Sequence, residues 1–183
     1  MRHWTMLLLL IGSLSTGCSG VKVGQDYWQG QDFSRYTYYR WQPQPPVSSR
    51  DIRANSPLLQ QRFRQAIDAA LAQRGYRQAA TADFLVSYEY EVRSRFDPDP
   101  FDTSVAVGFG RYHNYGAVGI GSGYGYRQYD VGILAIDFTD ARTGGPIWRG
   151  TGSQLNIGQT NPQRTGAYVN RLVDAILAQF PPQ

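Results

Sequence analysis

The sequence predicts an α+β domain in which an antiparallel sheet carries two amphipathic helices on one face, with the elements in the order β-α-β-β-β-α. Two segments repeat apolar residues at spacings of three and four, which is the pattern of helices with one buried face. Other segments alternate apolar and polar residues and are bounded by glycine and proline, which is typical of antiparallel strands. The 183 residues are enough for one domain with its own core.

The first residues are typical of an export signal. Arg2 precedes an apolar stretch over 4–14, which is shorter than the roughly 20 residues needed to cross a bilayer. Small residues follow, and then Cys18, the only cysteine of the chain. This arrangement resembles the lipobox of bacterial lipoproteins, in which the cysteine is acylated and becomes the first residue. The alternative is an ordinary signal peptide that leaves Cys18 as a free thiol.

The resemblance implies a lipoprotein signal peptide at 1–17, lipidation of Cys18 and a lipidated tether at 18–31. A single α+β domain is expected at 32–183, with a Gly/Tyr-rich insertion at 105–129. The membrane is then the first expected partner, because each buried CH₂ group of an acyl chain contributes about 0.8 kcal/mol to anchoring. The expected location is the periplasmic face of the bacterial cell envelope. By analogy with bacterial lipoproteins, Ser19 rather than Asp after the cysteine implies the outer membrane.

The first strand is expected in the aromatic segment DFSRYTYYRWQP, residues 32–43, between Phe33 and Trp41. Residues 43–55 are rich in proline and serine without any apolar period, so they are expected to form a loop.

The first helix is expected to begin at Ser56 and Pro57, which supply an N-cap and a proline in the first turn. Gly75 is expected to end it. Its apolar stripe consists of Leu59, Phe63, Ala66, Ile67, Ala70 and Leu71.

Three strands are expected between the helices. The segment ADFLVSYEYEV directs Phe84, Val86, Tyr88, Tyr90 and Val92 to one face and Ser87, Glu89 and Glu91 to the other. Residues 131–138, VGILAIDF, are apolar on both faces and are expected at the centre of the sheet. The tight connection TDARTGGP, residues 139–146, leads to a hairpin partner at 147–155.

The second helix is expected to begin at Asn161 and Pro162, which repeat the cap and proline. Prolines 181 and 182 stop it. Its apolar stripe consists of Val169, Leu172, Val173, Ile176, Leu177 and Phe180.

Four segments together resemble the DUF4136 family of bacterial lipoproteins, a domain of unknown function. They are DFSRYTYYRW, AIDAALAQRGYRQAATADFLVSYEYEV, LAIDFTDARTGGPIWRGTGS and RLVDAILAQFPP. The resemblance covers about residues 25–183, and its most specific pieces are RGYRQAATADFLVSY and DARTGGPIWRG. It implies an α+β domain in the cell envelope, and it brings no catalytic set that could be placed on this chain.

Few side chains could carry chemistry. His113, the only histidine after the signal segment, lies among glycines that would not hold it rigidly enough for a Ser–His–Asp arrangement. One histidine without a second cysteine does not supply the three or four ligands of a zinc site. Asp97, Asp99 and Asp102 could hold a weak calcium ion, although a plain acidic loop explains them as well. We therefore expect no catalytic, metal or cofactor-binding residues.

Two alternative functions stay open. Glu89 and Glu91 stand two residues apart on one strand, about 6.6–6.8 Å between Cα atoms, a spacing that the acid/base pair of a cell-envelope hydrolase tolerates. Two solvent-facing residues of a half-buried strand are the simpler interpretation. The other alternative is a small-ligand carrier whose aromatic pocket is lined by Tyr36, Tyr38, Tyr88, Tyr90 and Trp148. The competing interpretation is that these rings pack in the core.

The Gly/Tyr-rich segment 105–129 is the most distinctive stretch, with seven glycines between tyrosines and arginines. It lacks the glycine motifs that cradle phosphates. Tyrosine and arginine on an adaptable backbone favour partner binding, and the candidate residues are Arg111, Tyr112, Tyr115, Tyr124, Tyr126, Arg127 and Tyr129. The alternatives are a mobile insertion and a glycine-rich hairpin that extends the sheet.

These observations predict a lipid-anchored cell-envelope protein that acts as a non-catalytic binding or structural module facing the periplasm. The chain has 18 basic and 14 acidic residues, and Lys22 is its only lysine. For an exported protein such a surface suits anionic lipid, a cell-wall polymer or an acidic envelope protein, so no nucleic-acid partner is expected. Solvated helix faces and an arginine-rich composition explain the charge equally well.

Overall fold

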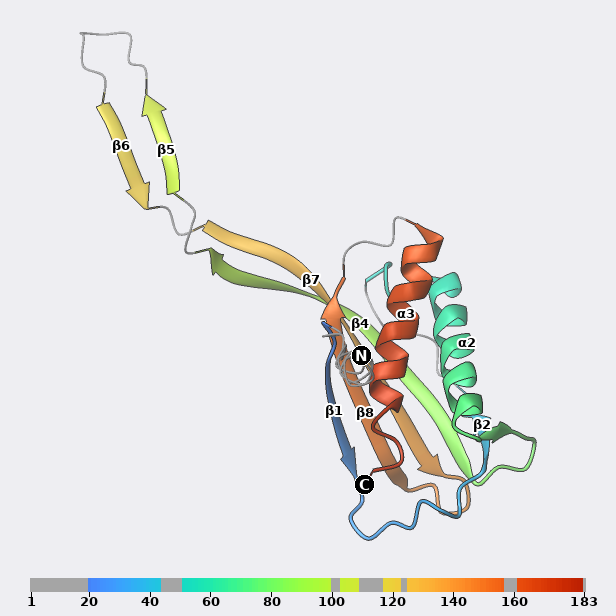
Figure 1. Cartoon of the computed structure of the whole chain (residues 1–183). Helices are drawn as coiled ribbons and strands as arrows, with labels where there is room; N and C mark the ends of the chain where they lie inside the picture. Colours follow the sequence, from blue (N-terminus) through green and yellow to red (C-terminus); the bar gives the residue numbers. More distant parts are fainter. Residues whose placement is uncertain are drawn as a thin grey trace, which may run out of the picture.

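The computed structural model describes residues 20–43, 51–99, 103–108, 117–122, 125–156 and 161–182, with the backbone alone at 97–99, 103–108, 117–122 and 125–127. The elements are β1 (Lys22–Tyr27), β2 (Tyr38–Trp41), α2 (Pro57–Gln73), β3 (Arg77–Gln78), β4 (Phe84–Asp99), β5 (Thr103–Gly108), β6 (Ala117–Ser122), β7 (Gly125–Asp140), β8 (Pro146–Leu155) and α3 (Pro162–Leu177). A six-stranded sheet in the order β1-β8-β7-β4-β2-β3 forms one layer, and α2 and α3 cover one of its faces (Figure 1). The predicted α+β class is confirmed.

The prediction of a purely antiparallel sheet is wrong, because the sheet is mixed. The strands β1, β8, β7 and β4 pair antiparallel in turn, whereas β2 runs parallel to both β3 and β4. The helix α2 connects β2 to the following strands across the face of the sheet, and such a strand–helix–strand crossover returns in the starting direction. The predicted order also omitted β1, β3, β5 and β6.

The strand β1 lies at one edge of the sheet, within the segment 18–31 that was predicted to be a tether. Lys22 to Tyr27 pair with β8 over their full length. The fold therefore begins about ten residues before the predicted start at 32. In the other predicted strand segment, 32–43, only Tyr38–Trp41 is extended.

Both helices begin at the predicted residues. Ser56 has the extended conformation of an N-cap before α2, although its side chain makes no capping hydrogen bond. Asn161 caps α3 fully, since its side chain accepts hydrogen bonds from the backbone N–H groups of Gln163 and Arg164. Gly75, after the end of α2, has a φ of +89°, as expected for a helix-ending glycine. Within the described residues, neither α2 nor α3 has the length and hydropathy of a membrane-spanning helix.

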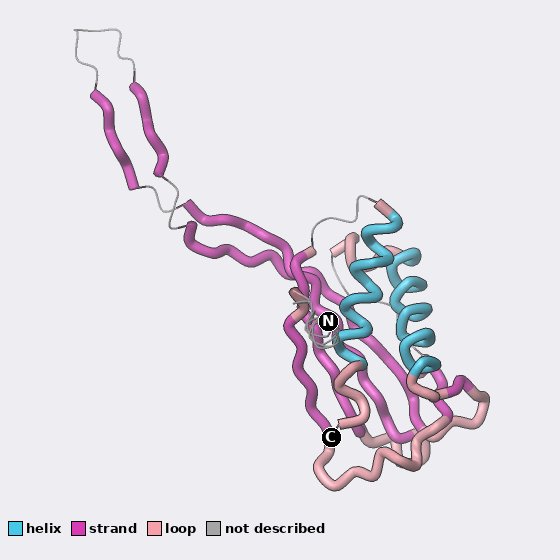
Figure 2. The backbone as a smooth tube through the Cα atoms, viewed as in Figure 1, coloured by secondary structure: helices cyan, strands magenta, loops and turns pink. Residues whose placement is uncertain are grey.

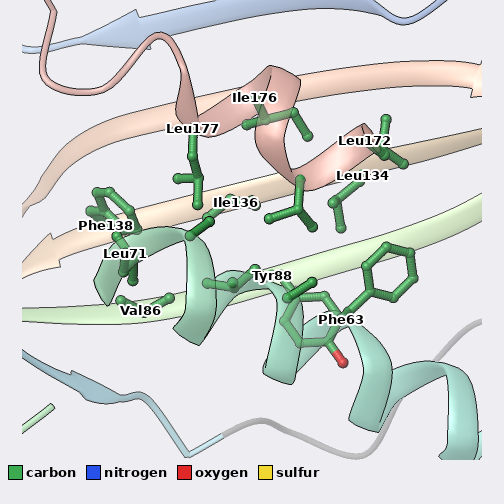
Figure 3. Close-up of a cluster of buried hydrophobic side chains, with 14 of the residues drawn as sticks. Phe63, Leu71, Val86, Tyr88, Leu134, Ile136, Phe138, Leu172, Ile176 and Leu177 are labelled. Atoms are coloured by element: carbon green, nitrogen blue, oxygen red, sulfur yellow. The ribbon is translucent and has the colours of Figure 1, made fainter. Parts of the chain in front are cut away.

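The core lies between the helices and the sheet. It contains the residues of both predicted apolar stripes and the first four inward residues of the predicted alternation, together with Tyr39, Ala54 and Tyr168, which these patterns did not predict. Figure 3 shows side chains of α2 and α3, such as Phe63 and Ile176, directed at side chains of the sheet, such as Leu134 and Ile136. At one end the rings of Phe84, Phe138, Trp148 and Phe180 form a cluster with centroid distances of 4.7–5.1 Å between neighbours. Such pairs stabilise a core beyond the area they bury.

The strands β4 and β7 are much longer than their neighbours and leave the domain together. They pair from Phe84 and Asp140 to Asp99 and Gly125. The pairing of β7 with β8 ends at Val131, and that of β4 with β2 ends at Val86. Residues 94–99 and 125–130 therefore pair only with each other, and together with the paired strands β5 and β6 we call them the arm. Figure 2 shows the arm projecting from the two-layered domain.

Candidate functional site

The arm contains most of the segment that the sequence singled out as a partner-binding candidate. Residues 103–108 and 117–122 form paired strands, in agreement with the hairpin alternative for the Gly/Tyr-rich segment. Tyr126 and Arg127 belong to β7, where they face Pro98 and Asp97 of β4. Tyr129, opposite Arg95, is partly buried at the root of the arm. The candidates Arg111, Tyr112, Tyr115 and Tyr124 lie outside the described residues, as do Cys18 and His113.

An ion-pair network fixes the root of the arm on the side of the helices. Asp130 of β7 accepts a hydrogen bond from the Ser94 hydroxyl of β4 at 2.6 Å, and it pairs with Arg53. The guanidinium of Arg53 also donates a hydrogen bond to Asp51 at 2.7 Å. Since Arg53 lies in the segment before α2, its pair with Asp130 connects that segment to the arm. The hydrogen bonds from Ser94 and Arg53 lower the pKa of Asp130, so its charge is stabilised in the folded chain.

A hollow of about 470 Å³ lies at the root of the arm, and we call it the arm-base hollow. It is lined by Gly20, Lys22, Arg95, Tyr129, Val131, Ser153, Gln154 and Leu155. Sequence reasoning had identified Tyr129 among these, but not Lys22 or Arg95. They are 73 positions apart, and only the pairing of β1, β8, β7 and β4 brings them to one place. The isolated lysine at the start of the domain was the one signal in the sequence.

A second hollow of about 520 Å³ lies at the opposite end of the domain, where the chain enters β2 and leaves α2. Its lining includes Asp32, Tyr36, Arg74, Tyr76 and Pro182. The polar group of Tyr36 is already occupied, because its hydroxyl donates a hydrogen bond to Asp140 at 2.9 Å. Arg35 donates to the same carboxylate at 2.8 Å. The polar side chains at this end of the domain, Tyr36 and Arg35, therefore hydrogen-bond to Asp140 of the same domain.

Glu89 and Glu91 lie on the open face of the sheet, opposite the helices. Glu91 pairs with Arg93 at 2.6 Å, and Glu89 is exposed near Arg149. The pKa of Arg149 is raised by its hydrogen bonds to Asp137 and, to a smaller extent, by the charge of Glu89. Neither glutamate lines either hollow. The pair therefore has the arrangement of solvent-facing residues rather than of two carboxylates that converge on a substrate.

The aromatic residues considered for a ligand pocket mostly belong to the core. Tyr88, Tyr90 and Trp148 are buried, and the ring of Phe63 packs on both tyrosines at centroid distances of 5.7 and 4.8 Å. Burial raises the pKa of Tyr88 to about 12, as expected for a phenol away from water. Tyr36 lines the second hollow, while Tyr38 is 44% exposed on the sheet surface.

The described part of the chain contains no group of three or more metal-binding side chains. Asp97 and Asp99 lie in β4, where the structure gives their backbone alone, and Asp102 is outside the described residues.

Comparisons with known proteins give one family and distant structural neighbours. A search of the curated proteins found no match. A PDZ domain protein from Parabacteroides distasonis ATCC 8503 is 15% identical with a TM-score of 0.51, over 89% of this chain and 36% of that protein, which shows a shared fold alone. The PelC dodecamer from Paraburkholderia phytofirmans is 11% identical with a TM-score of 0.48, over 86% of this chain and 95% of that one. The family model of a domain of unknown function, DUF4136, matches residues 23–182, and this chain therefore belongs to the DUF4136 family.

Proposed function

We propose that this protein is a lipid-anchored, non-catalytic binding or structural module of the bacterial cell envelope, which faces the periplasm and presents the arm to an envelope protein or a cell-wall polymer. The observation that carries the proposal is the arm itself. Two strands of the sheet continue past every other strand and pair only with each other. A two-stranded ribbon is marginally stable in water on its own, so an arm of this length favours a role in which a partner covers it.

The anchor is supported by the sequence around Cys18 and by the position of β1. Only three residues, 19–21, separate the cysteine from the first strand of the sheet. An acyl group on Cys18 would therefore hold the folded domain directly at the membrane surface. Ser19 supports the outer membrane as the membrane concerned.

The absence of catalysis is supported by the hydrogen bonds of two carboxylates, the buried Asp140 and the half-buried Asp68. Asp140 accepts hydrogen bonds from Tyr36, Arg35 and two backbone N–H groups. Asp68 accepts from the Tyr39 hydroxyl and the Trp41 indole. Asp140 thus connects the β7–β8 turn to the loop before β2, and Asp68 connects α2 to β2, so their carboxylates already serve as acceptors within the fold.

Mass spectrometry of the mature N-terminus tests the anchor. The full chain is expressed in a Gram-negative host, membranes are separated, and the terminal peptide is analysed. We expect an acylated Cys18 in the outer-membrane fraction, whereas a Cys18→Ser variant should lose the modification and leave that fraction. A mature wild-type chain with a bare thiol in the soluble extract would overturn the proposal.

Shortening the arm tests its role. Replacing residues 97–127 with the two-residue turn Asn-Gly joins Phe96 to Gln128, which already face each other across the ribbon. In cells treated with a cross-linker, adducts of the wild-type chain should be lost in this variant, while its acylation and membrane fraction stay the same. A control is Arg142→Gln in the turn after β7, which should keep the adducts. Adducts that persist without the arm would place the binding surface elsewhere.

A further inference from the structure

We infer that the arm-base hollow binds the phosphate headgroup of an anionic phospholipid of the membrane in which the chain is anchored. The inference rests on the proposed function for where the hollow lies, because it takes Cys18 to be acylated. The affinity of the hollow for the headgroup is a property of the folded domain and can be measured without the anchor.

Strand pairing places the side chains of Lys22, Arg95, Tyr129, Val131, Ser153 and Leu155 on one face of the sheet, opposite the helices. Partners that face each other across strands share a face, and so do residues two apart on one strand. The series runs from Lys22 to its partner Ser153, along β8 to Leu155, across to Val131, along β7 to Tyr129, and across to Arg95. Four neighbouring strands thus supply these six side chains from a single face.

The charge of the hollow is suited to an anion. Lys22 from β1 and Arg95 from β4 contribute an ammonium and a guanidinium group, and no acidic residue is among the described residues that line it. Both cations are exposed. A guanidinium forms paired hydrogen bonds with phosphate oxygens, while an ammonium acts as a compact charge. The Ser153 hydroxyl is an additional donor on the same face.

The remaining lining is apolar, which distinguishes a lipid from a free anion. Val131 is buried at 8% exposure, although it is on the face that the helices do not cover. Leu155 beside it is 53% exposed, one of the large apolar side chains that the core leaves in water. The ring of Tyr129 lines the same hollow. Aromatic rings are favoured at the level of lipid headgroups, where one end is wet and the other is apolar.

The hollow lies close in the chain to the proposed lipid anchor. Gly20 forms part of its rim, and Cys18 is two residues earlier. An extended chain advances at most about 3.6 Å per residue, so the Cα atom of Cys18 is within about 7 Å of that of Gly20. Figure 1 shows β1 beginning beside the point where the arm leaves the domain. An acylated Cys18 therefore holds the hollow among headgroups, at a high effective concentration.

The test uses the mature chain of the proposed function, residues 18–183, with Cys18→Ser so that no acyl group contributes. Dihexanoyl phosphatidylglycerol is titrated below its micelle concentration, and binding is followed by calorimetry and by NMR shifts of the Tyr129 and Leu155 signals. Dihexanoyl phosphatidylcholine and inorganic phosphate are titrated in parallel. We expect phosphatidylglycerol to bind at least tenfold more tightly than either, with shifts at both residues.

Two variants separate charge from apolar contact. The pair Lys22→Gln and Arg95→Gln should weaken phosphatidylglycerol binding about 30-fold, since each basic residue near an anionic lipid is worth about a factor of five. Leu155→Gln should weaken phosphatidylglycerol and leave inorganic phosphate unchanged. The matched control is Arg77→Gln with Arg142→Gln, which removes the same charge from exposed positions away from the hollow and should have no effect. Circular dichroism and the melting temperature confirm that each variant is folded.

Three results would overturn the inference: equal binding of the two lipids, unchanged affinity in the Lys22→Gln, Arg95→Gln variant, or inorganic phosphate bound as tightly as phosphatidylglycerol. The last would show an anion site without lipid recognition. Failure of the anchor proposal and failure of the headgroup proposal can be told apart. A bare Cys18 together with selective lipid binding would contradict only the proposed anchor. An acylated Cys18 in the native chain, together with equal binding of the two lipids in the titration, would contradict only the headgroup site.

Discussion

Asp140 illustrates how single residues of this fold are held by several weak contacts at once. This residue is 4% exposed at the end of β7, and its carboxylate accepts hydrogen bonds from Tyr36, Arg35 and the backbone N–H groups of Arg142 and Thr143. Burial by itself would raise its pKa, but the hydrogen bonds, led by that from Thr143, outweigh burial and lower it to about 2. The charged form therefore closes the turn between β7 and β8 and fixes the loop before β2.

Asp140→Asn should lower the free energy of unfolding by about 1–3 kcal/mol at pH 7, because an amide cannot accept all of these hydrogen bonds. The folded-state pKa lies below the ordinary value of 3.8, so the contribution is complete above about pH 4 and is lost as the pH falls towards 2. Urea unfolding between pH 7 and 2 should therefore show a smaller acid loss in the variant than in the wild type.

The control for this prediction is Asp137→Asn. Its carboxylate pairs with Arg149, which is half-exposed on the open face of the sheet. A pair of this kind contributes less than about 1 kcal/mol. Similar losses of stability in the two variants would contradict the role assigned to Asp140.

Gly150 lies where Ile176 of α3 packs directly against the sheet. A Cβ atom at this position would lie 2.2 Å from the Trp148 ring and 2.6 Å from Ile176 of α3. Gly150→Ala should lower the free energy of unfolding by about 1–3 kcal/mol, because the ring or the helix must move. The melting temperature measures this effect. Gly145→Ala is the control, since its Cβ would have only an ordinary contact of 3.5 Å, and a change as large as that of Gly150→Ala would contradict the packing argument.

Among the elements, α3 allows two substitutions with opposite expected signs. Asn161→Ala removes the acceptor for two backbone N–H groups and should cost about 1 kcal/mol. Gly166→Ala should stabilise the chain by about 0.5–1 kcal/mol, because a Cβ there meets nothing within 4 Å and alanine loses less backbone entropy. Denaturant midpoints check both, and a destabilising Gly166→Ala would show that the glycine is needed for packing.

The elements that could be predicted from the sequence are those with a strong period. The stripe from Leu59 to Leu71 has spacings of three and four and is introduced by Ser56 and Pro57, so both the helix and its buried face were specified locally. The edge strand Lys22–Tyr27 could not be predicted in this way. Five of its six residues are exposed, and its pairing with β8 depends on residues more than 120 positions away.

The direction of β2 and the residues that line the arm-base hollow could not be predicted from the sequence for a related reason. The alternation of Tyr39 and Trp41 shows which side chains are buried, but it is the same for a parallel and an antiparallel neighbour. The hollow depends on register, because Lys22 and Arg95 approach each other only through two intervening strands. The sequence therefore identified Tyr129 by its composition and missed the cations around it.

At the scale of the whole molecule, one end of the sheet holds stabilising contacts and the other end holds the proposed functional surfaces. At one end the aromatic cluster around Phe138 and the hydrogen bonds of Asp140 close the domain. At the other end β1 begins, the arm departs and the arm-base hollow opens (Figure 1). The proposed anchor and both proposed binding surfaces belong to this second end, so the stabilising contacts and the proposed functional surfaces are separated along the sheet.

This separation predicts that the domain does not need the arm for its stability. The residues that β4 and β7 contribute to the core under the helices are within 84–90 and 134–138, whereas the arm begins at 94 and 130. Replacing 97–127 with Asn-Gly should therefore leave the melting temperature within about 3 °C of the wild type and preserve a single cooperative transition. A loss of cooperativity, or a melting temperature lower by 10 °C or more, would mean that the arm is part of the folding unit, and its proposed role as a surface for a partner would then need a different physical basis.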